Sequence, residues 1–160
     1  VGVASAVICA KAGANVTLVG RSLEKAEKIA GICNDRYDSK NVKGGADADK
    51  SDFFNVADIV LNTGAAGIQL MSEEHIKNSS TLKICADTNA VPPSGIAGVD
   101  VMDNGKVIDM SPSKCLGIGA LAIGNIKYKS QHECLKLMYT SEKPVYLDFE
   151  DAFKFAQKSV

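Results

Sequence analysis

The spacing of apolar residues predicts a helix followed by a buried strand near the start of the chain. Val3, Val7 and Ala10 fall about one helical turn apart, and Gly13 is typical of a helix end. The apolar run 16–19 then has the pattern of a short strand. A helix that leads into a strand in this way is typical of the second half of a βαβ unit.

The same alternation continues along the chain. Apolar runs predict further strands at 41–46, 57–62, 82–86 and 106–109. Helical spacing predicts helices at 23–34, 52–56 and 72–77. The pattern therefore indicates an α/β fold, with a Rossmann-like, doubly wound and mostly parallel sheet that carries helices on both faces.

The last third of the chain is predicted to be largely helical. The glycine-rich segment 117–124 is expected to open a long helix that continues to residue 139. Its inward-facing residues are expected to be Ile126, Cys134, Leu135 and Met138. Asp148 is expected to cap a final helix with an apolar docking face. We expect residues 1–160 to form one nucleotide-binding domain.

The turn after the strand 16–19 is basic. Dinucleotide-binding folds that use NAD place an acidic residue near this position to hold the ribose hydroxyls. Here Gly20 is followed by Arg21 and Ser22, with Lys25 one turn later. A guanidinium, a hydroxyl and an ammonium can all donate to a 2′-phosphate, so these three residues favour NADP over NAD. The alternative is a solvated helix start without a ligand.

Gly2 is a candidate for the third glycine of the dinucleotide fingerprint, which allows a helix to pack closely on a strand. The chain begins at Val1 without Met and already within the predicted helix. We therefore expect a partial domain, in which the first strand and the first two glycines lie upstream. The alternative for Gly2 is an ordinary helical glycine.

Small residues follow the strand 57–62 directly. Thr63, Gly64, Ala65 and Ala66 would let the backbone approach a ligand beyond the carboxyl end of that strand. The strand 82–86 ends in a second loop, 87–98, which a Pro-Pro pair makes rigid. Both loops are expected to lie at the same edge of the sheet. The alternative is a compact turn that binds nothing.

Composition excludes several classes of function. The net charge of −1 and the absence of basic runs give no support for nucleic-acid binding, and no apolar run has membrane-spanning length. The five scattered cysteines are typical of reduced thiols in a cytoplasmic protein. His75 and His132 stand apart from other ligand types, so no metal site is expected. Asp87 and Asp100 are expected to cap loop N–H groups rather than to form an acid–base pair.

Four segments together resemble one family, the NADP-dependent methylene-tetrahydromethanopterin and methylene-tetrahydrofolate dehydrogenases of methylotrophic bacteria. The segments are Val-Gly-Arg-Ser-Leu-Glu-Lys-Ala at 19–26, Thr-Gly-Ala-Ala-Gly-Ile at 63–68, Ala-Asp-Thr-Asn-Ala-Val-Pro-Pro-Ser-Gly-Ile at 86–96 and Gly-Ala-Leu-Ala-Ile-Gly-Asn-Ile-Lys at 119–127. The Asn-Ala-x-Pro-Pro loop is the most specific of them. The family tends to have glycine where this chain has Ala122 and Asn125.

The resemblance implies a C-terminal NADP-binding domain that is paired with an N-terminal catalytic domain, which this chain lacks. It implies hydride transfer from a methylene-tetrahydropterin to NADP, with the pterin bound between the two domains, in a homo-oligomer. Arg21, Ser22 and Lys25 would then hold the 2′-phosphate. Residues 63–66 would contact the ribose and pyrophosphate, and Asn89 would lie near the nicotinamide. The catalytic residues stay unknown, and this chain alone is expected to be inactive.

Two other classes of function remain open from the residues. One is the cofactor domain of a shikimate-dehydrogenase-like or glutamyl-tRNA-reductase-like enzyme, which would share the basic turn but not the loop 89–93. The other is a non-catalytic NADP-binding or redox-sensing module. The sequence does not choose between tetrahydromethanopterin and tetrahydrofolate.

Overall fold

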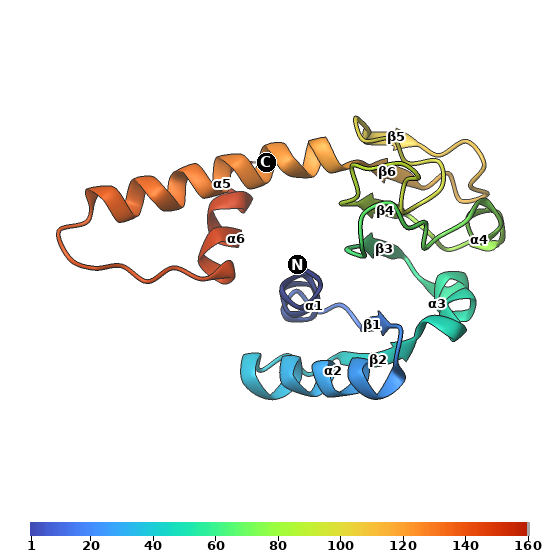
Figure 1. Ribbon diagram of the computed structural model, residues 1–160, viewed down its shortest axis with the longest axis horizontal. Helices are drawn as coiled ribbons and strands as arrows, with labels where there is room; N and C mark the ends of the chain where they lie inside the picture. The colour runs from blue at the N-terminus through green and yellow to red at the C-terminus, as the bar shows by residue number, and fades with distance from the viewer. Residues whose placement is uncertain (160) are drawn as a thin grey trace.

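The computed structural model describes residues 1–159 and contains two parallel-strand units, each with its own helices (Figure 1). The first unit comprises α1 (Gly2–Lys11), β1 (Val16–Gly20), α2 (Leu23–Tyr37) and β2 (Val42–Ala46). A short 3₁₀ turn (Asp47–Asp49) and α3 (Lys50–Val56) lead to the second unit. The second unit comprises β3 (Ile59–Asn62), α4 (Glu73–Asn78), β4 (Ile84–Asp87), β5 (Asn104–Val107) and β6 (Leu116–Ile118). The chain ends in α5 (Ala120–Thr140) and α6 (Phe149–Gln157).

Parallel pairing dominates both sheets. β1 pairs with β2 in parallel, and the second sheet has the order β3-β4-β6-β5, with only β5 antiparallel. The helix α2 connects β1 to β2 and the helix α4 connects β3 to β4, as in βαβ units, whereas β4 reaches β6 through a loop and β5. The predicted α/β, Rossmann-like class is therefore confirmed.

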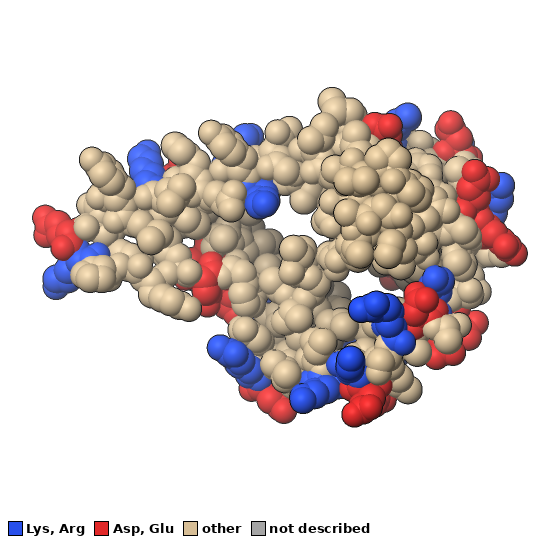
Figure 2. Space-filling view, in the orientation of Figure 1, with Lys and Arg blue, Asp and Glu red and all other residues tan. Residues whose placement is uncertain are grey.

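The described residues form two sheets rather than one, because no ladder joins β1 to β3. The strands that flank this break carry exposed apolar side chains. Val19 of β1 is 39% exposed, and Ile59 and Leu61 of β3 are 54% and 43% exposed. In the space-filling view the molecule is open near its centre, beside the four-stranded unit (Figure 2). Parallel sheets normally bury both faces, so the exposure of these apolar side chains on β1 and β3 is unusual.

Each unit has a separate core. In the first unit, Ala6, Val7 and Ala10 of α1 pack against α2 and β2. The second unit buries a larger apolar cluster: Met71, Ile76, Leu82, Cys85, Ile96, Val99, Ile108 and Cys115. The helix α6 returns to the first unit, where Lys11 pairs with Glu150 at 2.7 Å and the ring of Phe149 lies 5.4 Å from that of Tyr37.

Three details of the sequence predictions for the C-terminal third differ from the structure. The predicted long helix is present as α5, but it begins at Ala120 rather than at residue 117, because Gly117 and Ile118 belong to β6. A Cβ on Gly119 would lie 2.0 Å from the Asp100 carbonyl oxygen, so close backbone packing rather than helix initiation explains that glycine. Ile126, Leu135 and Met138 were predicted to face inward but are 37%, 64% and 52% exposed. The predicted strand 106–109 is instead β5, which starts earlier.

Candidate functional site

The basic turn lies between the carboxyl end of β1 and the first turn of α2. Ser22 is the N-cap of α2, and its hydroxyl accepts a hydrogen bond from the Lys25 N–H at 3.5 Å. The turn opens into a cavity of about 500 Å³. Its lining residues are Leu18, Gly20, Arg21, Ser22, Lys25, Ala26 and Ile29. The structure therefore brings together the three residues predicted to contact the 2′-phosphate.

The charges of this cavity are free to meet an anion. Among the residues that the structure describes, neither Arg21 nor Lys25 forms an ion pair, and both side chains are exposed. Glu24 is the one acidic residue in the first turn of α2. Unpaired backbone N–H groups at the start of a helix add to the attraction for a phosphate. A guanidinium, an ammonium, a hydroxyl and a helix N-terminus form a donor set that fits a phosphate dianion.

The turn 63–67 follows β3 directly, as predicted, and leaves Gly64, Ala65 and Ala66 exposed. A Cβ on Gly64 would lie 2.5 Å from Leu70 Cδ1 and 3.1 Å from Asn62 Oδ1. A Cβ on Gly2 would lie 2.9 Å from Thr63 Oγ1, so the start of α1 abuts the start of this turn. Gly2 and Thr63 are therefore neighbours, although they belong to different units of the fold.

The loop after β4 places Asn89 next to the same turn. Asn89 is 5% exposed, and its side-chain oxygen accepts from the N–H groups of Gly67 at 3.3 Å and Val91 at 2.9 Å. Its side-chain amide donates to the Pro93 carbonyl at 2.8 Å. These bonds hold the loop in shape. A contact between Asn89 and a nicotinamide stays a prediction.

The predicted site residues thus form two groups. Arg21, Ser22 and Lys25 share the cavity at the basic turn, whose lining includes neither residues 63–67 nor Asn89. Gly2, the turn 63–67 and Asn89 form the second group, at the carboxyl ends of β3 and β4. In doubly wound folds ligands bind beyond these strand ends.

Sequence reasoning missed two contributors. Asn62, the last residue of β3, is 4% exposed and bonds both the turn and β4. Asn62 could have been identified as a polar residue at the end of an apolar strand. Ile29 lines the basic cavity from one turn beyond Lys25, which the helical spacing could have indicated. The prediction that Asp87 and Asp100 cap loop N–H groups is confirmed by the bonds from Asn89 N to Asp87 and from Met102 N to Asp100.

The buried Cys85 thiol beneath this edge is a poor nucleophile. Burial raises the pKa of the Cys85 thiol, and the nearby Cys115 sulfur, 4.0 Å away, raises it further. A thiol with a raised pKa stays neutral at physiological pH, and the thiolate is the reactive form. Cys85 therefore contributes packing in β4 rather than covalent chemistry.

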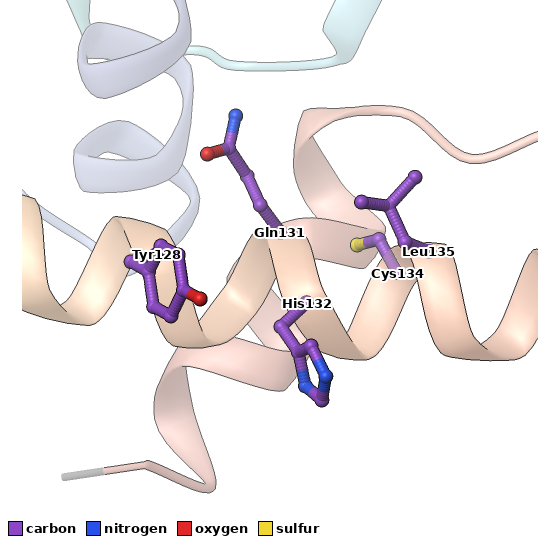
Figure 3. A pocket seen from close by; sticks show the side chains of 5 residues that line it. All are labelled: Tyr128, Gln131, His132, Cys134 and Leu135. Atoms are coloured by element: carbon purple, nitrogen blue, oxygen red, sulfur yellow. The ribbon is translucent and has the colours of Figure 1, made fainter.

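A second hollow, of about 420 Å³, lies along α5 and contains no predicted site residue. Its lining residues are Tyr128, Gln131, His132, Cys134 and Leu135. Figure 3 shows that all five come from this one helix and that Gln131 and His132 point to different sides of it. Their polar atoms do not converge on a common point.

Two further classes of site find no support in residues 1–159. Residues 1–159 contain no group of three or more His, Cys, Asp or Glu side chains that could hold a metal ion. No helix in the same range combines the length and the apolar character needed to cross a bilayer.

No protein-family model matches the chain. The chain is 38% identical over 155 residues to the NAD(P)-dependent methylenetetrahydromethanopterin dehydrogenase of Methylorubrum extorquens. This match covers 95% of this chain and 52% of that protein. The chain is 35% identical over 149 residues to the bifunctional protein MdtA of the same organism, covering 91% of this chain and 50% of that protein. The chain thus spans about half the length of the curated relatives it matches. The resemblance to the methylene-tetrahydromethanopterin dehydrogenase family is confirmed.

Proposed function

We propose that this chain, a relative of the methylene-tetrahydromethanopterin dehydrogenases, is the NADP-binding domain of an oxidoreductase. The enzyme would transfer hydride from methylene-tetrahydromethanopterin or methylene-tetrahydrofolate to NADP in one-carbon metabolism. The observation that carries the proposal is the cluster of Arg21, Ser22 and Lys25 around an open cavity at the end of β1. The relative named as NAD(P)-dependent supports the same class of cofactor.

We assign each part of the cofactor to one region of the chain. Arg21, Lys25 and the Ser22 hydroxyl hold the 2′-phosphate at the start of α2. Residues 63–66 offer exposed backbone to the ribose and pyrophosphate, and Gly2 keeps α1 close to Thr63. The nicotinamide then lies on the Asn89 side. NADP supplies the hydride acceptor, while this domain binds and orients it.

The break between the two sheets supports a further strand in the complete domain. β1 and β3 each have one unpaired edge within the described chain, and Val19, Ile59 and Leu61 are exposed beside it. A parallel strand from an upstream segment would pair with both edges and enter α1 at Gly2. The sheet order would then be β2-β1-new strand-β3-β4-β6-β5, which is a doubly wound arrangement.

The length of the matched relatives supports the partner prediction as well. The matched relatives are about twice the length of the matched segment, which leaves room for an N-terminal catalytic domain. The exposed apolar residues Tyr128, Leu135 and Met138 of α5 offer a contact surface for it. We place the pterin between the two domains, in a cytoplasmic homo-oligomer. This chain alone would be inactive.

The test uses the protein with its upstream half present. Methylene-tetrahydromethanopterin and methylene-tetrahydrofolate are each supplied in turn, and the formation of NADPH is compared with that of NADH. NADP-dependent turnover of either pterin supports the proposal and ranks the substrates. Tight NADP binding without turnover of either pterin favours a shikimate-dehydrogenase-like enzyme, a glutamyl-tRNA-reductase-like enzyme or a non-catalytic module instead.

A further inference from the structure

A chain of side-chain hydrogen bonds holds both ends of the turn 63–67. At the first end, the Gly64 N–H donates to Asn62 Oδ1 at 2.9 Å. At the other end, the Gly67 N–H donates to Asn89 Oδ1 at 3.3 Å. Asn62 and Asn89 lie 27 positions apart in the chain, on different strands or loops, yet they meet on the same carboxylate.

That carboxylate is Asp87, the last residue of β4, which is 1% exposed. Its Oδ1 accepts from Asn62 Nδ2 at 2.7 Å and from the Asn89 N–H at 2.9 Å. Its Oδ2 accepts from the Ile96 N–H at 3.0 Å. No Lys, Arg or His forms an ion pair with it among residues 1–159, so hydrogen bonds alone compensate the buried carboxylate.

Gly95 packs tightly against the hydrogen-bonded side chains of Asn62 and Asp87. A Cβ on Gly95 would lie 1.7 Å from Asn62 Nδ2 and 2.9 Å from Asp87 Oδ1. Because the Asn62 amide bridges Asp87 and Gly64, moving it would break a bond at one end of the turn. The Gly95 position is therefore shaped by the Asn62–Asp87 pair.

We propose that Asp87 is a positioning residue, which fixes the turn 63–67 in the shape that binds the ribose and pyrophosphate without touching the cofactor. This inference rests on the proposed function and deepens it. Asp87 acts through Asn62 on Gly64 and through Asn89 on Gly67. Preformed backbone donors bind a ligand more tightly, since binding then costs little further ordering.

This network of three donors requires a carboxylate at position 87. All three partners of Asp87 are donors, and an ionised carboxylate only accepts. In Asp87→Asn, one of the two oxygens becomes an NH₂ group that faces either the Ile96 N–H or the two donors on Oδ1. At least one donor then loses its acceptor, and the turn loses its fixed shape.

The test compares two ligands in the protein with its upstream half present. NADP spans both groups of site residues, whereas adenosine 2′-monophosphate (2′-AMP) carries only the phosphate that belongs to the basic turn. For Asp87→Asn we expect the Kd for NADP to rise about tenfold or more, with the Kd for 2′-AMP within about twofold of the original. Asp103→Asn is the matched control, because Asp103 is also buried, at 6% exposed, and caps the Asp100 N–H at 2.8 Å.

Two outcomes overturn the inference. One is a folded Asp87→Asn variant that binds NADP as the original protein does. The other is an equal loss of NADP and 2′-AMP binding, which indicates a general disturbance. Where Asp87→Asn does not fold, Asn62→Ala removes the Gly64 bond and leaves two backbone donors on Asp87, and the same selective loss is expected.

Failure of the proposed function has a different signature. In that case the original protein binds neither NADP nor 2′-AMP. Amide hydrogen exchange at Gly64 and Gly67 then decides the structural part of the inference. Faster exchange in Asp87→Asn than in Asp103→Asn supports the fixing of the turn, and equal exchange overturns it.

Discussion

The basic turn and the turn 63–67 are both proposed to contact the cofactor, but they are built in opposite ways. Within residues 1–159, the basic turn offers exposed charges that form no ion pair, and its side chains carry no hydrogen bond beyond the Ser22 cap. The turn 63–67 offers mainly backbone, and a buried network centred on Asp87 holds it at both ends. The proposed binding would therefore use charge in the first region and a preformed backbone shape in the second.

The difference follows from what each part of a dinucleotide demands. A 2′-phosphate carries concentrated charge, and flexible cationic side chains can follow it at little cost in precision. The pyrophosphate and ribose are contacted through main-chain groups, which cannot reach out, so the loop itself has to be in place beforehand. Changes in the first region should therefore affect one phosphate contact, while changes in the second should affect folding and binding together.

The largest expected effect comes from Gly95→Ala. The added Cβ would lie 1.7 Å from Asn62 Nδ2 and would displace that amide. Gly95 does not have a positive φ, so the expected loss comes from this clash and not from the backbone conformation. We expect a loss of about 3 kcal/mol in the free energy of unfolding, from overpacking and a broken bond to a charged group. Urea unfolding measures it.

Gly31→Ala is the control for that substitution. Gly31 lies within α2, and a Cβ there meets nothing within 4 Å. Alanine is the better helix former, so this variant should gain about 0.5–1 kcal/mol. A Gly95→Ala variant as stable as Gly31→Ala would contradict the description of a rigid, tightly packed region.

Arg21→Ala should have the next largest effect, on affinity rather than on stability. It removes a charge-assisted contact to the 2′-phosphate, so NADP binding should weaken by about 2 kcal/mol, or roughly 30-fold, while NAD binding changes little. Because Arg21 is exposed and unpaired in the described chain, stability should change by less than about 0.5 kcal/mol. Calorimetric titration with both cofactors measures the ratio. Equal weakening of NADP and NAD binding would rule out the phosphate assignment.

Ser22→Ala tests the one fixed bond of the basic turn. Loss of the N-cap should lower the free energy of unfolding by about 1 kcal/mol and should weaken NADP binding by less than Arg21→Ala does. Ser22→Asp provides the contrast, because an aspartate caps the helix equally well but repels a phosphate. Thermal unfolding and NADP titration of the two variants separate the capping role from the binding role. An aspartate variant that keeps full NADP affinity would contradict the binding role.

The smallest expected effect concerns pH and the buried floor of the rigid region. Burial raises the pKa of Cys85 above its ordinary value of 9.0, so the folded state keeps a neutral thiol where the unfolded state ionises. This contribution to stability is complete below pH 9 and is lost as the pH rises further. Between pH 8 and 9.5 it amounts to about 0.8 kcal/mol. Between these two pH values, the free energy of unfolding of Cys85→Ala, measured in urea, should fall by about 0.8 kcal/mol less than that of the original protein. An equal fall in the two proteins would show that Cys85 ionises as freely in the folded state as in the unfolded state.

The same contrast marks what could be predicted in advance. Arg21, Ser22 and Lys25 are close in sequence, on a strand end and a helix start, so local pattern alone was enough to bring them together. The role of Asn62 depends on Asp87, which lies 25 positions away on a neighbouring strand. Such a pair arises only when the parallel register of β3 and β4 sets Asn62 opposite Asp87.

Errors in the C-terminal third have a related cause. Gly117 and Ile118 carry too few residues to show a strand period, and only pairing with β4 and β5 makes them β6. The direction of Leu135 and Met138 could not be read from spacing, because α5 has apolar residues on more than one side. Packing against α6 selects one of these sides and leaves the other exposed.

The sequence by itself determined the order of helices and strands as far as β5, the basic turn with its Ser22 cap, and the resemblance to the methylene-tetrahydromethanopterin dehydrogenase family. These features depend on short-range spacing and on local hydrogen bonding, which a linear pattern records. Only the tertiary structure decided the strand β6, the exposed face of α5 and the convergence of Asn62 and Asn89 on Asp87. Those features depend on which strand edges meet and on which groups are buried together, and neither is written in neighbouring residues.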